Sequence, residues 1–229
     1  FIAGSINTHR NLASKIARSA KAHALVTDYR LAPENPFPAQ LEDAFVAYKW
    51  LISEKQINPE NIIISGDSAG GNLAISVLIK IRDEGLPLPA AAICLSPVTD
   101  LTASGESMIS RAESDPMVTP EAIEFMIKSY LDGTDPKNPL ASPLYADLSG
   151  LPPTFIQAGT AEVLLDDSTR IAQKLESEGV DTELDIWEDM IHVFATFADI
   201  APESKQAIEK IGNFIEKIYA RNPQHVKVF

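Results

Sequence analysis

The sequence has one cysteine, few basic residues and no long apolar run, and each shortage excludes a class of protein. Cys94 alone cannot form an internal disulfide or a cysteine-based zinc site, and its apolar run AAAICLSP predicts a buried core residue. Lysine and arginine number 19 against 32 acidic residues, and the net charge of −13 argues against nucleic acid or an anionic membrane as partner. No stretch has the apolar length that spans a bilayer. Because the cysteine usage fits a reducing compartment, we expect a cytoplasmic protein.

The chain instead alternates short apolar runs with amphipathic segments, which is typical of an α/β protein with a mainly parallel sheet. Its 229 residues are enough for one large domain. Five strands are expected, at His23–Tyr29, Asn61–Ser65, Ala90–Ser96, Pro153–Gly159 and Thr182–Glu188. The principal helices are expected at residues 7–22, 40–56, 71–84, 166–178 and 204–219.

One segment breaks this alternation. Residues 101–152 are rich in proline and contain a predicted helix at Pro120–Leu131, with Thr119 as its N-cap. An insertion of this kind between two strands is where a lid over an active site would lie. We therefore expect residues 1–100 and 153–229 to form the core and residues 101–152 to form a cap.

The sequence NIIISGDSAGGNLAIS contains a Gly-x-Ser-x-Gly pattern around Ser68. A buried strand leads into the pattern and a helix follows it, which is the strand–turn–helix setting of a nucleophilic serine. The glycines permit a sharp turn, and the N-terminus of the helix stabilises negative charge. The alternative is a phosphate-binding turn, but no lysine follows as a P-loop requires.

A nucleophilic serine needs a base and an acid. Of the four histidines, His9, His23 and His225 fall in a helix, at the start of a strand and in the tail, whereas His192 follows the last strand. His192 is therefore the predicted base. Candidate acids follow the fourth strand: Glu162, directly after it, is preferred. Asp166 and Asp167 stand where a helix begins, and N-capping would also explain them.

Five ordered motifs together carry a family resemblance: VTDYRLAPENPFPAQLEDAF, ISGDSAGGNLA, LSPVTDLT, SPLYADLSGLPPTFIQAGTAEVLLDDS and DMIHVF. The chain resembles the bacterial branch of the hormone-sensitive-lipase-like carboxylesterases, which are α/β-hydrolases with a helical cap. The resemblance implies hydrolysis of short-chain carboxylic esters, a small-molecule substrate and no metal or cofactor. It places the nucleophile on Ser68, the histidine on His192 and the acid on Glu162, with Asp166 as the alternative. The backbone N–H of Ala69 becomes an oxyanion-hole donor.

The same resemblance implies a His-Gly-Gly-Gly motif just before FIAGSINTHR, with which this chain begins. Those glycines supply oxyanion donors, so we expect three preceding strands and part of the cap to be missing and the isolated chain to be impaired. Residues that flank the converging motifs are candidates to line a substrate pocket, although core packing explains each equally well: Phe1, Met117, Val118, Ile191, Val193 and Phe194.

Two other functions fit the same fold. A ligand-binding protein without turnover would keep the pocket, but such proteins usually lose the serine or the histidine, and this sequence has both. An interaction module would use the sheet edge exposed by missing strands, which favours a homodimer. Amidases and thioesterases use the same triad, and the residues alone do not separate them from esterases.

Overall fold

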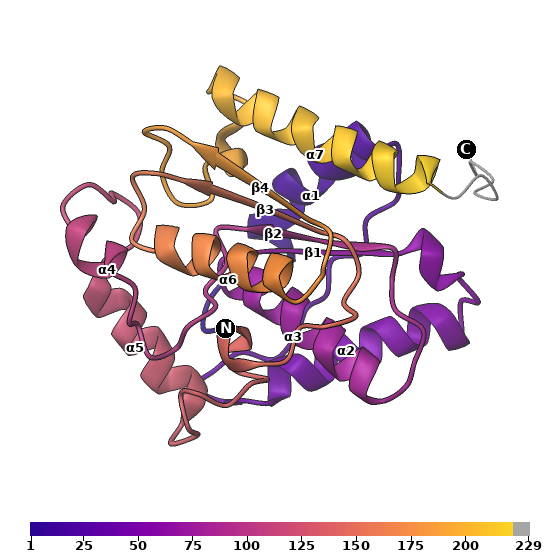
Figure 1. Ribbon diagram of the computed structural model, residues 1–229, viewed down its shortest axis with the longest axis horizontal. Coiled ribbons are helices and arrows are strands. Elements are labelled where there is room, and N and C mark those ends of the chain that lie inside the picture. Colours follow the sequence, from indigo (N-terminus) through magenta and orange to yellow (C-terminus); the bar gives the residue numbers. More distant parts are fainter. Residues whose placement is uncertain (222–229) are drawn as a thin grey trace.

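A computed structural model describes residues 1–221, and its centre is a four-stranded parallel sheet (Figure 1). The strands lie in sequence order, and each pairs in parallel with its neighbours. Their bounds are β1 Ile63–Asp67, β2 Ala91–Leu95, β3 Thr154–Gly159 and β4 Thr182–Trp187. Because all four strands run the same way, their carboxyl ends share one edge, and the loops that leave that edge are brought together.

Helices cover both faces of the sheet. They are α1 Ile6–Ala20, α2 Ala39–Ser53, α3 Ala69–Asp83, α4 Ser107–Ser110, α5 Pro120–Leu131, α6 Leu165–Ser177 and α7 Pro202–Ala220. Short 3-10 helices occupy Pro59–Asn61, Pro143–Tyr145 and Phe194–Phe197. Figure 1 shows α7 on one side of the sheet and α3 and α6 on the other. The α/β class predicted from the alternation is confirmed.

Strand β2 is apolar throughout because both of its faces are buried. Ile93 and Leu95 pack with residues of α1 and α7 on one face, whereas Ala92 and Cys94 pack with residues of α3 and α6 on the other. Cys94 is a free, fully buried residue, and burial raises the pKa of its thiol to about 12. The prediction that it belongs to the core is therefore correct.

The predicted strand at His23–Tyr29 is wrong: residues 1–221 form four strands, not five. No described strand pairs with residues 23–29, and Leu25 is 54% exposed. A strand exists through its ladder hydrogen bonds, so a suitable sequence without a neighbour does not form one. The other predicted strands, and the predicted helices, are present with ends shifted by up to three residues.

Residues 101–152 contain α4 and α5 and join the sheet through a separate apolar cluster. Leu101, Met108 and Ile123 of this segment pack there with Val163 and Leu164, which follow β3. Helix α5 begins at Pro120, as predicted, and Thr119 caps it by accepting the Ala122 N–H at 3.3 Å. This packing holds the segment against the loop that precedes α6.

Among the described residues, no helix has both the length and the apolar character needed to cross a membrane.

Candidate active site

Ser68 lies in a sharp turn between β1 and α3. It is the N-cap of α3, with φ of 53° and ψ of −116°, a conformation that a serine adopts only when its surroundings impose it. A Cβ on Gly66 would lie 2.1 Å from the Gly70 carbonyl oxygen, and one on Gly71 would lie 2.8 Å from Cβ of Pro97. The two glycines therefore permit the close packing that holds Ser68 at the start of the helix.

Ala69 is the first residue of α3, so its N–H belongs to the group that has no acceptor inside the helix. The Ser68 carbonyl instead accepts the N–H groups of Gly71 and Asn72, at 3.0 and 3.2 Å. The N-terminus of α3 thus presents a backbone donor beside Ser68, together with the positive end of the helix dipole.

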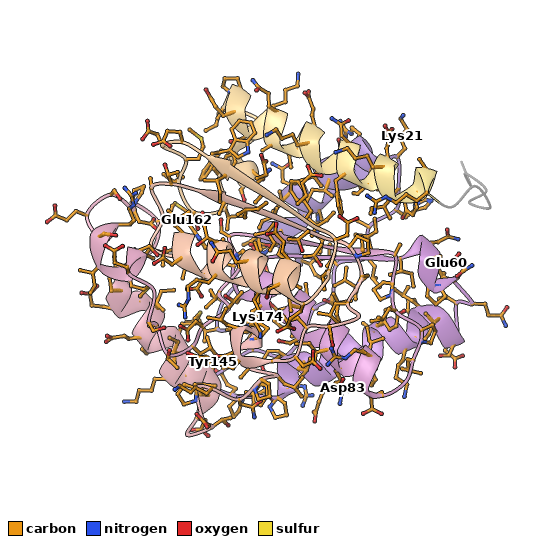
Figure 2. The ribbon with its side chains drawn as sticks, viewed as in Figure 1. Lys21, Glu60, Asp83, Tyr145, Glu162 and Lys174 are labelled. Carbon is orange, nitrogen blue, oxygen red and sulfur yellow. The ribbon has the colours of Figure 1, made fainter. Side chains whose placement is uncertain are left out.

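Glu162 and His192 form a buried pair at the same edge of the sheet. Glu162 is fully buried and His192 is 6% exposed, and Oε2 of the carboxylate lies 2.8 Å from Nδ1 of the imidazole. Figure 2 shows Glu162 at the end of the sheet where α6 begins. The other oxygen, Oε1, accepts the Gly159 N–H at 2.6 Å and the Ser96 hydroxyl at 3.0 Å. With a carboxylate on Nδ1, the imidazole carries its proton there and Nε2 is left as the basic atom.

Asp166 does not occupy the position beside the histidine. Its Oδ2 accepts the Ser107 N–H at 3.0 Å, and the Ser107 hydroxyl accepts the Asp166 N–H at the same distance. This reciprocal pair ties α4 to the start of α6. The geometry therefore favours Glu162 over Asp166 as the partner of His192.

Asp167 is nearly fully buried at the start of α6, and its Oδ2 accepts the N–H groups of Thr99 and Asp100 at 2.6 and 2.9 Å. Burial outweighs these bonds and raises the pKa of Asp167 to about 7. Burial also opposes ionisation of Asp100, but hydrogen bonds from Ser104 and Thr102 prevail and lower its pKa to about 2. Arg170 lies 3.0 Å from the Asp100 carboxylate.

A cavity of about 210 Å³ joins the serine to the histidine. Its lining is mostly apolar and consists of Asp67, Ser68, Met117, His192, Val193, Thr196 and Phe197. Met117 and Val193 are two of the six predicted pocket residues. The other four lie outside this lining because they pack elsewhere: Phe1 stacks on Tyr130, Val118 joins the same cluster, and Ile191 and Phe194 pack between the sheet and α7.

Sequence reasoning missed four residues of this region. Thr196 and Phe197 lie in the 3-10 helix after His192, and no spacing in the sequence marks them. Asp67 belongs to the motif ISGDSAGGNLA, from which a role was predicted for Ser68 but none for the aspartate. Ser96 belongs to the motif LSPVTDLT, which contributed to the family resemblance but predicted no role for its serine. In both cases the motif was a signal that could have identified the residue.

The remaining histidines have other surroundings. His9 lies 3.3 Å from Asp67, and the hydrogen bond to that carboxylate raises the pKa of His9. His23 is exposed, and His225 lies outside the described residues. Of the three described histidines, His192 alone lines the cavity with Ser68.

A parallel sheet that brings a serine, a carboxylate and a histidine, in that chain order, to one edge is the architecture of an α/β-hydrolase. The family model described as the alpha/beta hydrolase fold matches residues 1–196.

An acetyl-hydrolase of Streptomyces hygroscopicus is 41% identical over 94% of this chain and 72% of its own length. The crystal structure of EstE5 soaked with p-nitrophenyl butyrate has a TM-score of 0.93 and 50% identity, over 96% of this chain and 74% of that one. An esterase of the bacterial hormone-sensitive lipase family has a TM-score of 0.92 and 50% identity, over 93% of this chain and 72% of that one. The chain belongs to the hormone-sensitive-lipase-like carboxylesterases of the α/β-hydrolase superfamily, which confirms the resemblance inferred from its motifs.

Proposed function

We propose that this protein hydrolyses short-chain carboxylic esters through an acyl-enzyme formed on Ser68. The observation that carries the proposal is the Glu162–His192 pair, in which Nδ1 faces the carboxylate at 2.8 Å while the histidine lines the same cavity as Ser68. Ester hydrolysis as a class is supported by relatives that are named esterases and acetyl-hydrolases. A pocket that serves only for binding would need neither a serine in a strained turn nor a histidine oriented by a buried carboxylate.

In the proposed reaction, Nε2 of His192 takes the hydroxyl proton of Ser68 as Oγ attacks the ester carbonyl. The tetrahedral intermediate places its negative oxygen near the Ala69 N–H and the N-terminus of α3. His192 then passes the proton to the departing alkoxide, and water cleaves the acyl-enzyme by the same sequence. Glu162 holds the imidazole in the required tautomer and stabilises its positive charge.

The cavity is small and mostly apolar, which suits a short acyl chain better than a long one. Residues 101–152 contribute Met117 to its lining, and we propose that this segment acts as the cap over the site. Among the described residues, Ala69 supplies the one oxyanion donor that we assign. Because removal of a single donor typically costs about 10²–10³ in rate, the Ala69 N–H is expected to contribute on that scale to turnover.

The test follows the acyl-enzyme rather than the released alcohol, because a butyryl group left on the protein marks the nucleophile directly. The chain is incubated with p-nitrophenyl butyrate, and mass spectrometry locates any butyryl group. We expect labelling of wild type, no labelling of Ser68→Ala, and wild-type labelling of Ser65→Ala, whose exposed serine lies on the same strand. A butyryl group that persists in Ser68→Ala would overturn the proposed nucleophile.

A further inference from the structure

Ser96 follows β2 directly and lies between the two loops that carry Glu162 and His192. It is 1% exposed, and its N–H donates to the Gln157 carbonyl at 2.7 Å, which extends the ladder between β2 and β3. Its φ is 46°, in the left-handed region that a serine rarely adopts. Such a conformation persists where surrounding contacts fix it, and the contacts of the Ser96 side chain involve the acid and the histidine loop.

The Ser96 hydroxyl makes two hydrogen bonds of opposite sense. It donates its one proton to Oε1 of Glu162 at 3.0 Å, and its oxygen accepts the Val193 N–H at 3.0 Å. Val193 is the residue after His192 and also has a left-handed backbone, with φ of 49°. One hydroxyl therefore links the acid of the triad to the backbone that carries the base.

The same strand end contacts the turn that carries the nucleophile. The Leu95 carbonyl accepts the Ser68 N–H at 2.8 Å, and the Val98 N–H donates to the Ser68 carbonyl at 3.2 Å. Residues 95–98 thus bind the backbone of Ser68, the side chain of Glu162 and the backbone of Val193. Three segments that are distant in sequence are held by one four-residue segment.

We propose that Ser96 is a positioning residue for ester hydrolysis, whose hydroxyl aligns Glu162 with the His192 loop. The inference rests on the proposed function. Without the hydroxyl, Oε1 of Glu162 retains the Gly159 N–H, while the Val193 N–H loses its acceptor. A buried donor without an acceptor is costly, so the His192 loop is expected to shift and to move the imidazole within the cavity that Ser68 also lines.

The experiment measures the rate of Ser68 acylation by p-nitrophenyl butyrate in Ser96→Ala, Ser96→Gly and Ser168→Ala. Ser96→Gly removes the hydroxyl but tolerates the left-handed backbone better than alanine does, so it separates the role of the hydroxyl from that of the backbone. Ser168→Ala is the matched control, because Ser168 is fully buried and its hydroxyl has no hydrogen-bond partner within residues 1–221. Thermal unfolding of each variant reports on folding.

We expect both Ser96 variants to lower the maximal acylation rate about 10- to 100-fold, with half-saturation within twofold of wild type. We also expect the acidic limb of the pH–rate profile to move to higher pH, because a carboxylate with one donor fewer stabilises the imidazolium more strongly. Ser168→Ala should change neither the maximal acylation rate nor the pH–rate profile.

A Ser96→Gly rate within threefold of wild type, an unmoved pH profile, or an equal loss in Ser168→Ala overturns the inference. If one Ser96 variant does not fold, the other gives the answer. If neither folds, the role of Ser96 is structural and the inference fails. Labelling that persists in Ser68→Ala contradicts the proposed function itself. If labelling is lost in Ser68→Ala but the Ser96 variants are acylated at the wild-type rate, only the inference about Ser96 is contradicted.

Discussion

Oε2 of Glu162 and Nδ1 of His192 lie 2.8 Å apart in a fully buried contact, although 29 residues separate them in the chain. The contact forms because β3 and β4 are parallel neighbours, so the loops that leave their carboxyl ends lie side by side. A glutamate reaches the imidazole from the loop while two further donors hold its other oxygen. The pair therefore fixes the tautomer of the histidine before any substrate binds.

This contact predicts a loss of acylation in Glu162→Gln, since the amide can present its NH₂ to Nδ1 and favour the wrong tautomer. We expect the acylation rate to fall by about 10²- to 10⁴-fold. Asp166→Asn is the matched control, because an amide oxygen can still accept the Ser107 N–H, and its rate should stay within threefold of wild type. A larger loss in Asp166→Asn than in Glu162→Gln would move the role of the acid to Asp166.

The tight turn at Ser68 predicts different outcomes for two neighbouring glycines. In Gly66→Ala the new Cβ would lie 2.1 Å from a backbone oxygen, so we expect a loss of several kcal/mol of stability, about 3 or more, or failure to fold. Gly70→Ala places its Cβ where no atom lies within 4 Å, and helix propensity favours alanine there. Urea unfolding of both variants is the measurement. Equal stability of the two would contradict the account of this turn.

Local patterns were enough to predict α5, because Thr119 and Pro120 mark its start by mechanisms that act within one turn. They also predicted that Ser68, Glu162 and His192 lie at one edge of the sheet, because a parallel sheet brings strand ends together, whereas the catalytic roles of these residues stay a prediction. They failed at residues 23–29, where the apolar pattern is that of a strand but no described strand lies alongside.

The role of Ser96 was equally hidden in the sequence. A serine after a buried strand is compatible with many roles. Its function here depends on two partners that lie 66 and 97 residues further along the chain. The cavity lining by Thr196 and Phe197 has the same origin, because it follows from how the 3-10 helix after His192 packs. Contacts that the tertiary fold creates leave no periodicity for sequence reasoning to detect.

Asp167 predicts an unusual pH dependence of stability. The pKa of Asp167 is about 7 in the folded chain and about 4 in the unfolded chain. Its contribution to the stability of the fold is therefore fully present below about pH 4. The contribution is lost as the pH rises towards 7, by at most about 1.4 kcal/mol per pH unit. Asp100 has a folded pKa of about 2, so the pH dependence of its contribution to stability has the opposite sign. That contribution is constant above about pH 5.

Asp167→Asn isolates this effect, because both amide donors bind Oδ2 and an amide oxygen can accept them equally. Urea unfolding of wild type and variant is compared at about pH 5 and about pH 8. We expect wild type to lose stability relative to Asp167→Asn as the pH rises. A stability difference that is the same at both pH values would show that Asp167 does not titrate in this range.

The cavity predicts that Met117 limits the length of the acyl chain. Met117 lines the space beside Ser68 and is 53% exposed, so shortening its side chain enlarges the pocket without opening a void in the core. We expect wild type to be acylated faster by p-nitrophenyl butyrate than by the octanoate, and Met117→Ala to raise the octanoate-to-butyrate ratio by about tenfold, since a few methylenes in an apolar pocket account for that much.

Phe125→Ala is the control for Met117→Ala, because Phe125 is 64% exposed on α5 and does not line the cavity. Its acyl-length ratio should equal that of wild type, so a change seen only at position 117 depends on the pocket. An equal rise in both variants would mean that general loosening of residues 101–152 admits longer chains. An unchanged ratio in Met117→Ala would place the limit on other residues that line the cavity, such as Val193 and Phe197.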